Sequence, residues 1–324
     1  MPVPSTEFDQ VTDITFLGKK SPDCSIFSCQ INKHWAWFGV PLGGYLTSAM
    51  LKAAIHCYPE RTPAALTSWI LRVSRSGLCI IEVKDLKISK QTFSTVTVTL
   101  QQPKEQNKSN EKLSSNYPIR INEYNPEEYQ ENCHAIITLT GPNHVEQGPT
   151  IIHPNARSPP NLDYMEPVDV FPKDEQRFII LQDMTQLKGG ESLAECHHAF
   201  EFLDNRPIDA FAVTFFADLY RYPLHMLPEK QDQVGYETTW KPTLQYEIQF
   251  KNPIPPNTTQ VLATFWIPHL ISGRFDMDGE LYTPNGKLLA TTRHHGIVIP
   301  RNTRQGLTAK KPTWQDGLPR SSKM

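Results

Sequence analysis

One face of a short segment in the second half of the chain is almost entirely apolar. The segment reads Arg206-Pro207-Ile208-Asp209-Ala210-Phe211-Ala212-Val213-Thr214-Phe215-Phe216-Ala217-Asp218-Leu219-Tyr220. Its apolar residues recur every three or four positions, which predicts a core-facing helix of about three turns. Asp218 is the exception, because at 100° per residue it falls about 20° from Phe211, at the edge of that face. A carboxylate there must be paired, hydrogen-bonded or catalytic, unless it turns to solvent at the helix end.

The bulk composition is typical of a soluble globular protein of about two domains. The chain has 324 residues, of which 39% are hydrophobic and 20% charged, enough to bury a sizeable core. A formal net charge of −2 without a long basic run argues against nucleic-acid binding. No apolar run is long enough to span a membrane. Residues 1–7 lack the basic and apolar regions of a secretory signal, so we expect none.

Cysteine and histidine spacing gives no indication of a metal or a cofactor. The six cysteines form no C-x-x-C pair, so free thiols in a reducing or neutral compartment are expected. Two adjacent histidine pairs occur, at 197–198 and 294–295. Neighbours on a strand point to opposite faces, so neither pair can converge on one metal. We expect one histidine of each pair to be buried and the other exposed.

The first part of the chain reads as strand, helix and four strands. Residues 1–22 look like a poorly specified leader, and 34–38 like an aromatic loop. A helix over 47–56 begins after Gly43-Gly44 and ends before Pro59. Strands are predicted at 24–31, 65–71, 78–88, 93–100 and 134–140, the last two adjacent in the sheet. Between them, about 101–131 is a polar surface insertion, partly disordered.

The second part repeats this order. After a Pro-rich linker, strands are predicted at 193–202, 243–250, 259–267, 273–282 and 288–299, with the apolar helix after the first and a turn at 283–287. We divide the chain into a first repeat at 1–141, a linker at 142–178, a second repeat at 179–302 and a flexible tail at 303–324. The fold class is α+β, each central helix being wrapped by an antiparallel sheet. Two such units could pair through their sheets and remove an exposed edge from each.

The glycine pair Gly43-Gly44 stands where the first helix begins. Glycine lets another chain or a ligand approach the backbone closely, and a helix N-terminus offers free N–H groups with a partial positive charge. A tight helix–sheet contact without a ligand would need the same residues.

Several of these segments together resemble the TesB-type acyl-CoA thioesterases. They are Val40 to Leu46, the strand series ending Gln91 to Val98, a second helix ending Ala-Asp, and a last strand of pattern Leu-Ala-Thr-Thr-x-x-x-Gly. The resemblance covers about residues 24–140 and 180–300. It implies a double hotdog fold and hydrolysis of an acyl-CoA or a related acyl thioester.

The resemblance also implies a site. The family's hydrolytic Asp, Thr and Gln fall on Asp218, Thr243 and His294. Histidine departs from the family's glutamine, which positions water without titrating, whereas histidine can also act as base or acid. The departure fits hydrolysis with an altered pH dependence, or a different substrate or reaction. A thioester also needs donors for its oxyanion, for which Gly43, Gly44 and Tyr45 are candidates, and an apolar tunnel for its acyl chain. The first helix carries no acidic residue, so we expect a single centre on the Asp218 side.

The sequence lacks the motifs of two other kinds of enzyme. No G-x-S-x-G elbow of a serine hydrolase occurs. The segment from Asp218 to His225 is two residues too long, and lacks the Asn, for the D-x-N-P-x-H loop of hotdog hydratases. A cyclase, lyase or isomerase of a biosynthetic pathway, or a non-catalytic acyl-binding protein, remains an alternative because of His294 and the polar insertion.

The last three residues, Ser322-Lys323-Met324, resemble the SKL-type peroxisomal address, with Met in place of Leu. They predict a peroxisomal enzyme that an import receptor recognises, with a cytoplasmic location as the alternative. Two fused repeats already satisfy the minimal hotdog pairing, and further association into a homo-oligomer through the sheets stays open.

Overall fold

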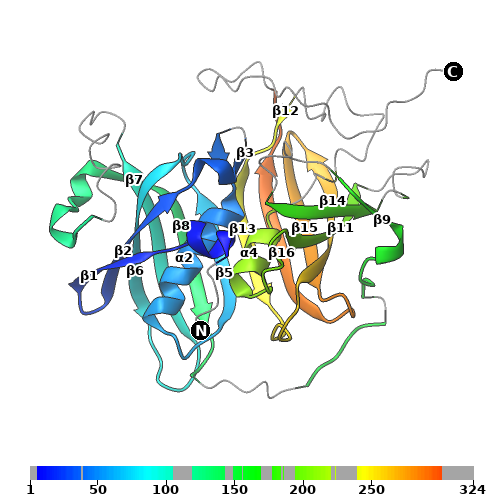
Figure 1. Ribbon diagram of the computed structural model, residues 1–324, viewed down its shortest axis with the longest axis horizontal. Coiled ribbons are helices and arrows are strands. Elements are labelled where there is room, and N and C mark those ends of the chain that lie inside the picture. Colours follow the sequence, from blue (N-terminus) through cyan, green and yellow to red (C-terminus); the bar gives the residue numbers. More distant parts are fainter. Residues whose placement is uncertain are drawn as a thin grey trace.

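The computed structural model describes residues 6–37, 39–104, 119–142, 149–154, 156–168, 177–183, 194–219 and 239–300, with residues 185 and 223. Two halves lie side by side, each with one central helix against the inner face of a curved antiparallel sheet (Figure 1). This is the predicted double hotdog. Among the described residues, no helix is long and apolar enough to cross a membrane.

The first half is built around helix α2, which covers Gly43–Cys57. Its main strands are β1 (Thr15–Ser21), β2 (Cys24–Ile31), β5 (Pro63–Ile70), β6 (Gly77–Lys87), β7 (Ser94–Pro103) and β8 (Tyr129–Leu139). Smaller elements are α1 (Glu7–Val11), η1 (Lys33–Trp35), β3 (Ala36–Trp37), β4 (Val40–Pro41), η2 (Ile121–Glu123) and η3 (Pro126–Glu128). The predicted strand neighbours at the insertion are confirmed, because β7 pairs with β8 along its length. Residues 105–118 of that insertion lie outside the described residues.

The second half is built around helix α4, which covers Ala210–Phe216. Its main strands are β10 (Phe178–Asp183), β11 (Glu195–Phe202), β13 (Thr243–Phe250), β14 (Gln260–Ile271), β15 (Arg274–Tyr282) and β16 (Leu288–Ile297). Smaller elements are η4 (Leu162–Tyr164), β9 (Met165–Pro167), β12 (Thr239–Trp240) and β17 (Ile299–Pro300). The predicted strands at 24–31 and 243–250 match β2 and β13 to the residue.

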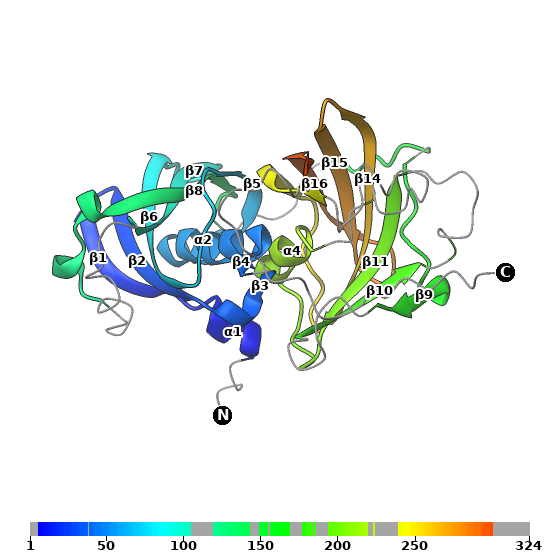
Figure 2. The ribbon, with the colours of Figure 1, turned by 90° about the horizontal axis from the view of Figure 1, so that it is seen from above.

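The two halves join through their sheets, as the sequence predicted. β5 of the first half pairs with β13 of the second, with Thr67 opposite Glu247. The result is one sheet of 13 strands in the order β1-β2-β6-β7-β8-β5-β13-β16-β15-β14-β11-β10-β9. Seen from above, α2 and α4 meet at the middle of the molecule, under this junction (Figure 2). The Ser48 hydroxyl of α2 donates a hydrogen bond to the Phe211 carbonyl of α4 at 2.9 Å.

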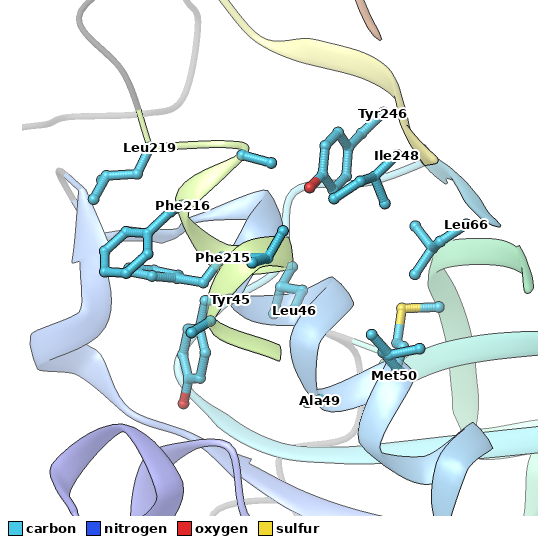
Figure 3. Packing of buried hydrophobic residues seen from close by; sticks show 14 of the residues in the cluster. Tyr45, Leu46, Ala49, Met50, Leu66, Phe215, Phe216, Leu219, Tyr246 and Ile248 are labelled. Carbon is cyan, nitrogen blue, oxygen red and sulfur yellow. The ribbon is translucent and has the colours of Figure 1, made fainter. Parts of the chain in front are cut away.

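Apolar side chains from both halves pack around the contact between α2 and α4. Phe215 and Phe216 of α4 lie near Tyr45 and Leu46 of α2, while Met50 points toward Leu66 of β5 (Figure 3). Phe216 stacks on Phe200 of β11 with ring centroids 5.3 Å apart. These side chains belong to one buried cluster that runs through both halves, and burial of their apolar surface fixes the two helices against each other.

Two predictions about the chain's edges were wrong. The expected leader at 1–22 contains α1, capped by Thr6 and anchored by buried Phe8 and Val11, and the edge strand β1. Phe8 packs against Phe202 and Phe215, so this segment closes the core of the second half. The linker and its border also supply β9 and β10, which extend the other end of the sheet.

Candidate active site

Asp218 lies in the turn directly after α4, not inside a three-turn helix as predicted. Asp209 caps the helix, its side chain accepting from the Ala212 N–H at 2.8 Å. At the other end, the N–H groups of Asp218 and Leu219 bond to carbonyls only three residues back, which tightens the last turn. The helix is therefore seven residues long. Its apolar face is buried as expected.

The carboxylate of Asp218 caps the helix of the other half. The N-cap residue of α2 is Leu42, which has no side-chain acceptor, so the first N–H groups of α2 need a partner from elsewhere. Asp218 Oδ2 accepts the Gly44 N–H at 2.6 Å, across 174 residues of sequence. A carboxylate is also favoured there by the partial positive charge of the helix N-terminus.

The glycine pair is what permits this contact. A Cβ at Gly44 would lie 2.6 Å from the Phe215 carbonyl oxygen and 2.9 Å from Asp218 Cβ. A Cβ at Gly43 would lie 2.9 Å from Asp218 Oδ2. The glycine pair therefore does two things. It lets the turn after α4 approach the backbone of α2 closely, and it directs backbone N–H groups to the carboxylate of Asp218.

His294 stands on the other side of the carboxylate. Its ring is completely buried on β16, with Nδ1 3.5 Å from Asp218 Oδ1. Nε2 lies 3.2 Å from both the Ala217 carbonyl oxygen and Thr292 Oγ1. Tyr246 stacks on the imidazole with centroids 4.7 Å apart, and donates its own hydroxyl to the Thr214 carbonyl at 2.7 Å. The ring is thus held on one face and at one edge.

Burial dominates the electrostatics of the Asp218–His294 pair. It raises the pKa of Asp218 to about 7, although the backbone N–H groups of Gly44 and Gly43 act in the opposite direction. Burial lowers the pKa of His294 to about 3, although the Ala217 carbonyl partly opposes this. At neutral pH the imidazole is therefore uncharged, and the carboxyl is near its midpoint, where it can both take and return a proton.

Thr243 faces the same side of the sheet as His294 but lies further along it. It is opposite Gly296 on β16, and opposed residues of an antiparallel pair share a face. A bulge between Thr243 and Gln245 puts Thr243 and Tyr246, three positions apart, on that one face. Gly296 is two residues from His294, about 7 Å along the strand. The structure thus brings Asp218 and His294 into contact. Thr243 lies about 7 Å further along the sheet from His294.

Tyr45 has the contacts of a core residue. Its ring is completely buried, and its hydroxyl donates to the Val11 carbonyl at 2.8 Å and accepts from the Asn32 N–H at 3.0 Å. Its own N–H bonds to the Leu42 carbonyl at 3.1 Å. These contacts tie α2 to the last residue of α1 and to the residue after β2.

The first half carries apolar side chains at the positions equivalent to Tyr246 and His294. The two halves are related across the centre of the β5–β13 ladder, where Thr67 is opposite Glu247. In the second half Tyr246 is opposite His294, whereas the equivalent cross-strand pair in the first half is Leu66 opposite Ile137. Both of those side chains are apolar and completely buried. This difference supports a single centre.

The adjacent histidine pairs alternate as predicted. His198 and His294 are completely buried, whereas the side chains of His197 and His295 are 23% and 41% exposed. Within the described ranges, no group of three or more potential ligands could hold a metal ion.

Two hollows occur beside α1. One, of about 990 Å³, is lined by residues of α1, β2 and the start of β6, and the other, of about 110 Å³, lies between α1 and the end of β11. Asp218, Thr243 and His294 line neither of them. The acyl tunnel between helix and sheet stays a prediction.

Sequence comparison identifies the family. An acyl-CoA thioesterase N-terminal domain matches residues 31–114, and an acyl-CoA thioesterase C-terminal domain matches residues 156–298. Together these domains span more than half of the chain, so the protein belongs to the acyl-CoA thioesterase family and is an enzyme of thioester hydrolysis. Comparison with curated protein sequences gave no match.

Solved structures share the fold. A protein from Thermobifida fusca, proposed to be a thioesterase II, superposes with a TM-score of 0.69 at 17% identity, over 92% of this chain and 99% of its own. A hot dog protein of unknown function from Alicyclobacillus acidocaldarius gives 0.65 at 18%, over 90% and 97%. The acyl-CoA thioesterase II TesB2 of Mycobacterium marinum gives 0.61 at 13%, over 92% and 100%. These similarities confirm the double hotdog.

Proposed function

We propose that the protein hydrolyses an acyl-CoA, or a related acyl thioester, to free acid and thiol at a centre formed by Asp218 and His294. One observation carries the proposal. A buried carboxyl from the second half is hydrogen-bonded to the N-terminus of the first half's helix and lies 3.5 Å from a buried histidine. Burial and directed hydrogen bonds of this kind are how enzymes adjust an acid or base to neutral pH.

In this mechanism Asp218 is the general base. Its carboxylate takes a proton from a water molecule while the water oxygen bonds to the thioester carbonyl carbon. The C–S bond then breaks, and the protonated Asp218 returns the proton to the sulfur, which leaves as the free thiol. A pKa of about 7 suits both transfers, because the group is basic enough to accept the proton and acidic enough to release it.

In the proposed mechanism Thr243 orients the water or the substrate. The support is that it shares the face of His294 at a separation of about 7 Å along the strand. Gly43 and Gly44 act through Asp218 by holding its carboxylate. A role for their N–H groups at the oxyanion stays a prediction, since the Gly44 N–H bonds to Asp218.

Thiol release from a panel of short-, medium- and long-chain acyl-CoAs tests the proposal. We expect release with at least one chain length, and a loss of about a thousandfold or more in Asp218→Asn, which cannot accept the proton. Asp276→Asn is the matched control, because Asp276 pairs with His295 at 3.0 Å on the exposed face of the same strands. No release from any acyl-CoA, or full release by Asp218→Asn, would overturn the mechanism.

His294 also supports a second candidate, a hotdog enzyme acting as a cyclase, lyase or isomerase in secondary metabolite biosynthesis. The observation in its favour is the histidine itself, whose ring nitrogens can exchange a proton with a substrate, which the family's amide cannot do. Such an enzyme would consume an acyl or polyketide-like substrate without releasing thiol. Mass analysis of the same reactions distinguishes the two, because hydrolysis adds one water and frees the thiol.

We further propose that Ser322-Lys323-Met324 directs the enzyme to the peroxisome through the import receptor. These residues lie outside the described part of the chain, so the support is the sequence alone, together with the acyl-CoA chemistry of that organelle. A fluorescent fusion with the tripeptide free at the C-terminus should give punctate signal, and its deletion should leave the fusion cytosolic. Punctate signal after the deletion would refute the address.

A further inference from the structure

The hydrogen bonds at the far side of the His294 ring determine where its proton lies. The Ala217 carbonyl oxygen, 3.2 Å from Nε2, can only accept a hydrogen bond. Thr292 Oγ1 is also 3.2 Å from Nε2, but its single proton is donated to the Glu247 carbonyl at 2.6 Å. Toward the ring this hydroxyl can therefore only accept as well. Both neighbours require that Nε2 carries the proton.

The opposite nitrogen then faces Asp218 as an acceptor. A neutral imidazole has one N–H and one lone pair, so a proton on Nε2 leaves the lone pair on Nδ1. Nδ1 lies 3.5 Å from Asp218 Oδ1. An ionised carboxylate and this lone pair would repel each other, whereas one proton on Oδ1 turns the contact into a hydrogen bond. Oδ2 is already committed to the Gly44 N–H.

We propose that Thr292 and the Ala217 carbonyl lock His294 in the Nε2–H tautomer, and that the locked Nδ1 accepts a hydrogen bond from the protonated form of Asp218. His294 thereby stabilises the acid that forms when Asp218 takes the proton of water. It acts as a positioning residue, with Thr292 positioning it in turn. This inference rests on the proposed function.

The neighbouring elements add no competing charge among the described residues. Tyr246 of β13, which stacks on the ring, is neutral because burial raises its pKa, and its hydroxyl donates to a carbonyl. β15 presents Met277 opposite His294, and α2 contributes only backbone N–H groups at Gly43 and Gly44. Among the described residues, the proton state of the site therefore depends mainly on Asp218 and His294 together.

The family's glutamine would act in the opposite sense at this position. Its amide N–H could donate to Asp218 Oδ1, and a hydrogen bond to the charged form favours ionisation. We therefore expect His294→Gln to move the acidic limb of the kcat/KM profile down by about one pH unit or more. The control His295→Gln changes the adjacent exposed ring of β16 and should leave that limb in place.

Two substitutions of Thr292 test the role of its hydroxyl group. Thr292→Val removes one of the two Nε2 acceptors and should lower kcat by about two- to tenfold, the effect of one hydrogen bond. Thr292→Ser keeps the hydroxyl and should restore kcat. If Thr292→Val acts like wild type, or if Thr292→Ser is as impaired as Thr292→Val, the positioning role of the hydroxyl fails.

Nitrogen NMR of the full-length protein labelled at its histidines tests the lock without using activity. The His294 signals, assigned by their loss in His294→Gln, should show a neutral ring protonated at Nε2 from about pH 5 to 9. A proton on Nδ1, or a charged ring near pH 6, would overturn the inference. An enzyme with no thioesterase activity but an Nε2–H ring would instead refute the proposed function alone, and an unmoved acidic limb in an active His294→Gln would refute the coupling to Asp218.

Discussion

Replacing Asp218 by Asn should stabilise the folded protein progressively as the pH rises. The side chain is only 9% exposed, and burial raises its pKa from 3.8 to about 7. The sign follows from proton binding. A carboxyl whose folded pKa is raised contributes stability below its unfolded pKa, and that stability is lost as the pH rises through the folded pKa. Asn does not ionise, so the variant keeps the stability that the wild type loses as Asp218 ionises.

The magnitude follows from the same shift. One pKa unit corresponds to about 1.4 kcal/mol, so ionising Asp218 costs the folded state about 4 kcal/mol well above pH 7. Between pH 5 and 8 the cost grows by about 3 kcal/mol, because only the span from 5 to 7 lies below the folded pKa. The amide can keep both contacts, since its oxygen can accept from Gly44 and its N–H can donate to His294.

Urea unfolding of wild type and Asp218→Asn at pH 5, 6, 7 and 8 measures this directly. The free energy of unfolding of the variant, relative to wild type, should increase by about 3 kcal/mol over that range. Asp276→Asn, whose carboxyl is 61% exposed, should give a nearly constant difference. A difference that is flat or declines with pH in Asp218→Asn would show that the folded protein favours the ionised carboxylate, and would refute the reasoning.

Three further changes test other parts of the site. His294→Gln should gain stability relative to wild type by about 1 kcal/mol between pH 7.5 and 4.5, because the lowered histidine pKa costs the wild type about 3 kcal/mol below pH 6.5 and the lower Asp218 pKa in the variant offsets about 1.4 kcal/mol of that gain; urea unfolding at the two pH values checks it, and a variant that loses stability relative to wild type on acidification would contradict it. Gly44→Ala places a Cβ 2.6 Å from the Phe215 carbonyl oxygen, so we expect a loss of about 1–3 kcal/mol in unfolding free energy and at least tenfold in kcat/KM. Wild-type values for both would show that the contact between α2 and α4 adjusts to the added Cβ without cost. Tyr246→Phe removes the donor of the Thr214 carbonyl and should cost about 1–3 kcal/mol, and an unchanged Tm in calorimetry would count against that buried hydrogen bond.

The long strands and both central helices could be predicted because their patterns are local. The alternation of β13 and the apolar spacing of α4 are present in the sequence itself. The segment at 1–22 was missed because β1 is a polar edge strand whose pairing with β2 creates it, and α1 has only two buried residues, Phe8 and Val11. Such elements gain their stability from tertiary contacts and not from their own periodicity.

Some residues of the site could likewise be predicted from the sequence, whereas their contacts follow only from the tertiary structure. Asp218 and His294 were selected from the sequence and its resemblance, but the hydrogen bond from Gly44 joins residues 174 positions apart and follows only from the packing of the two halves. Tyr246 was missed, although pairing the strands at 243–250 and 288–299 in the right register would have placed it opposite His294. Thr292 was detectable by its spacing of two from His294, which puts both on one face.

The pH dependence of kcat/KM for the best acyl-CoA substrate tests the central claim that Asp218 is the base. The wild-type rate of thiol release should rise through a midpoint near pH 7 to a plateau, and Asp218→Asn should lose about a thousandfold or more at every pH. A rate in Asp218→Asn that stays near wild type, with the same midpoint, would contradict the account.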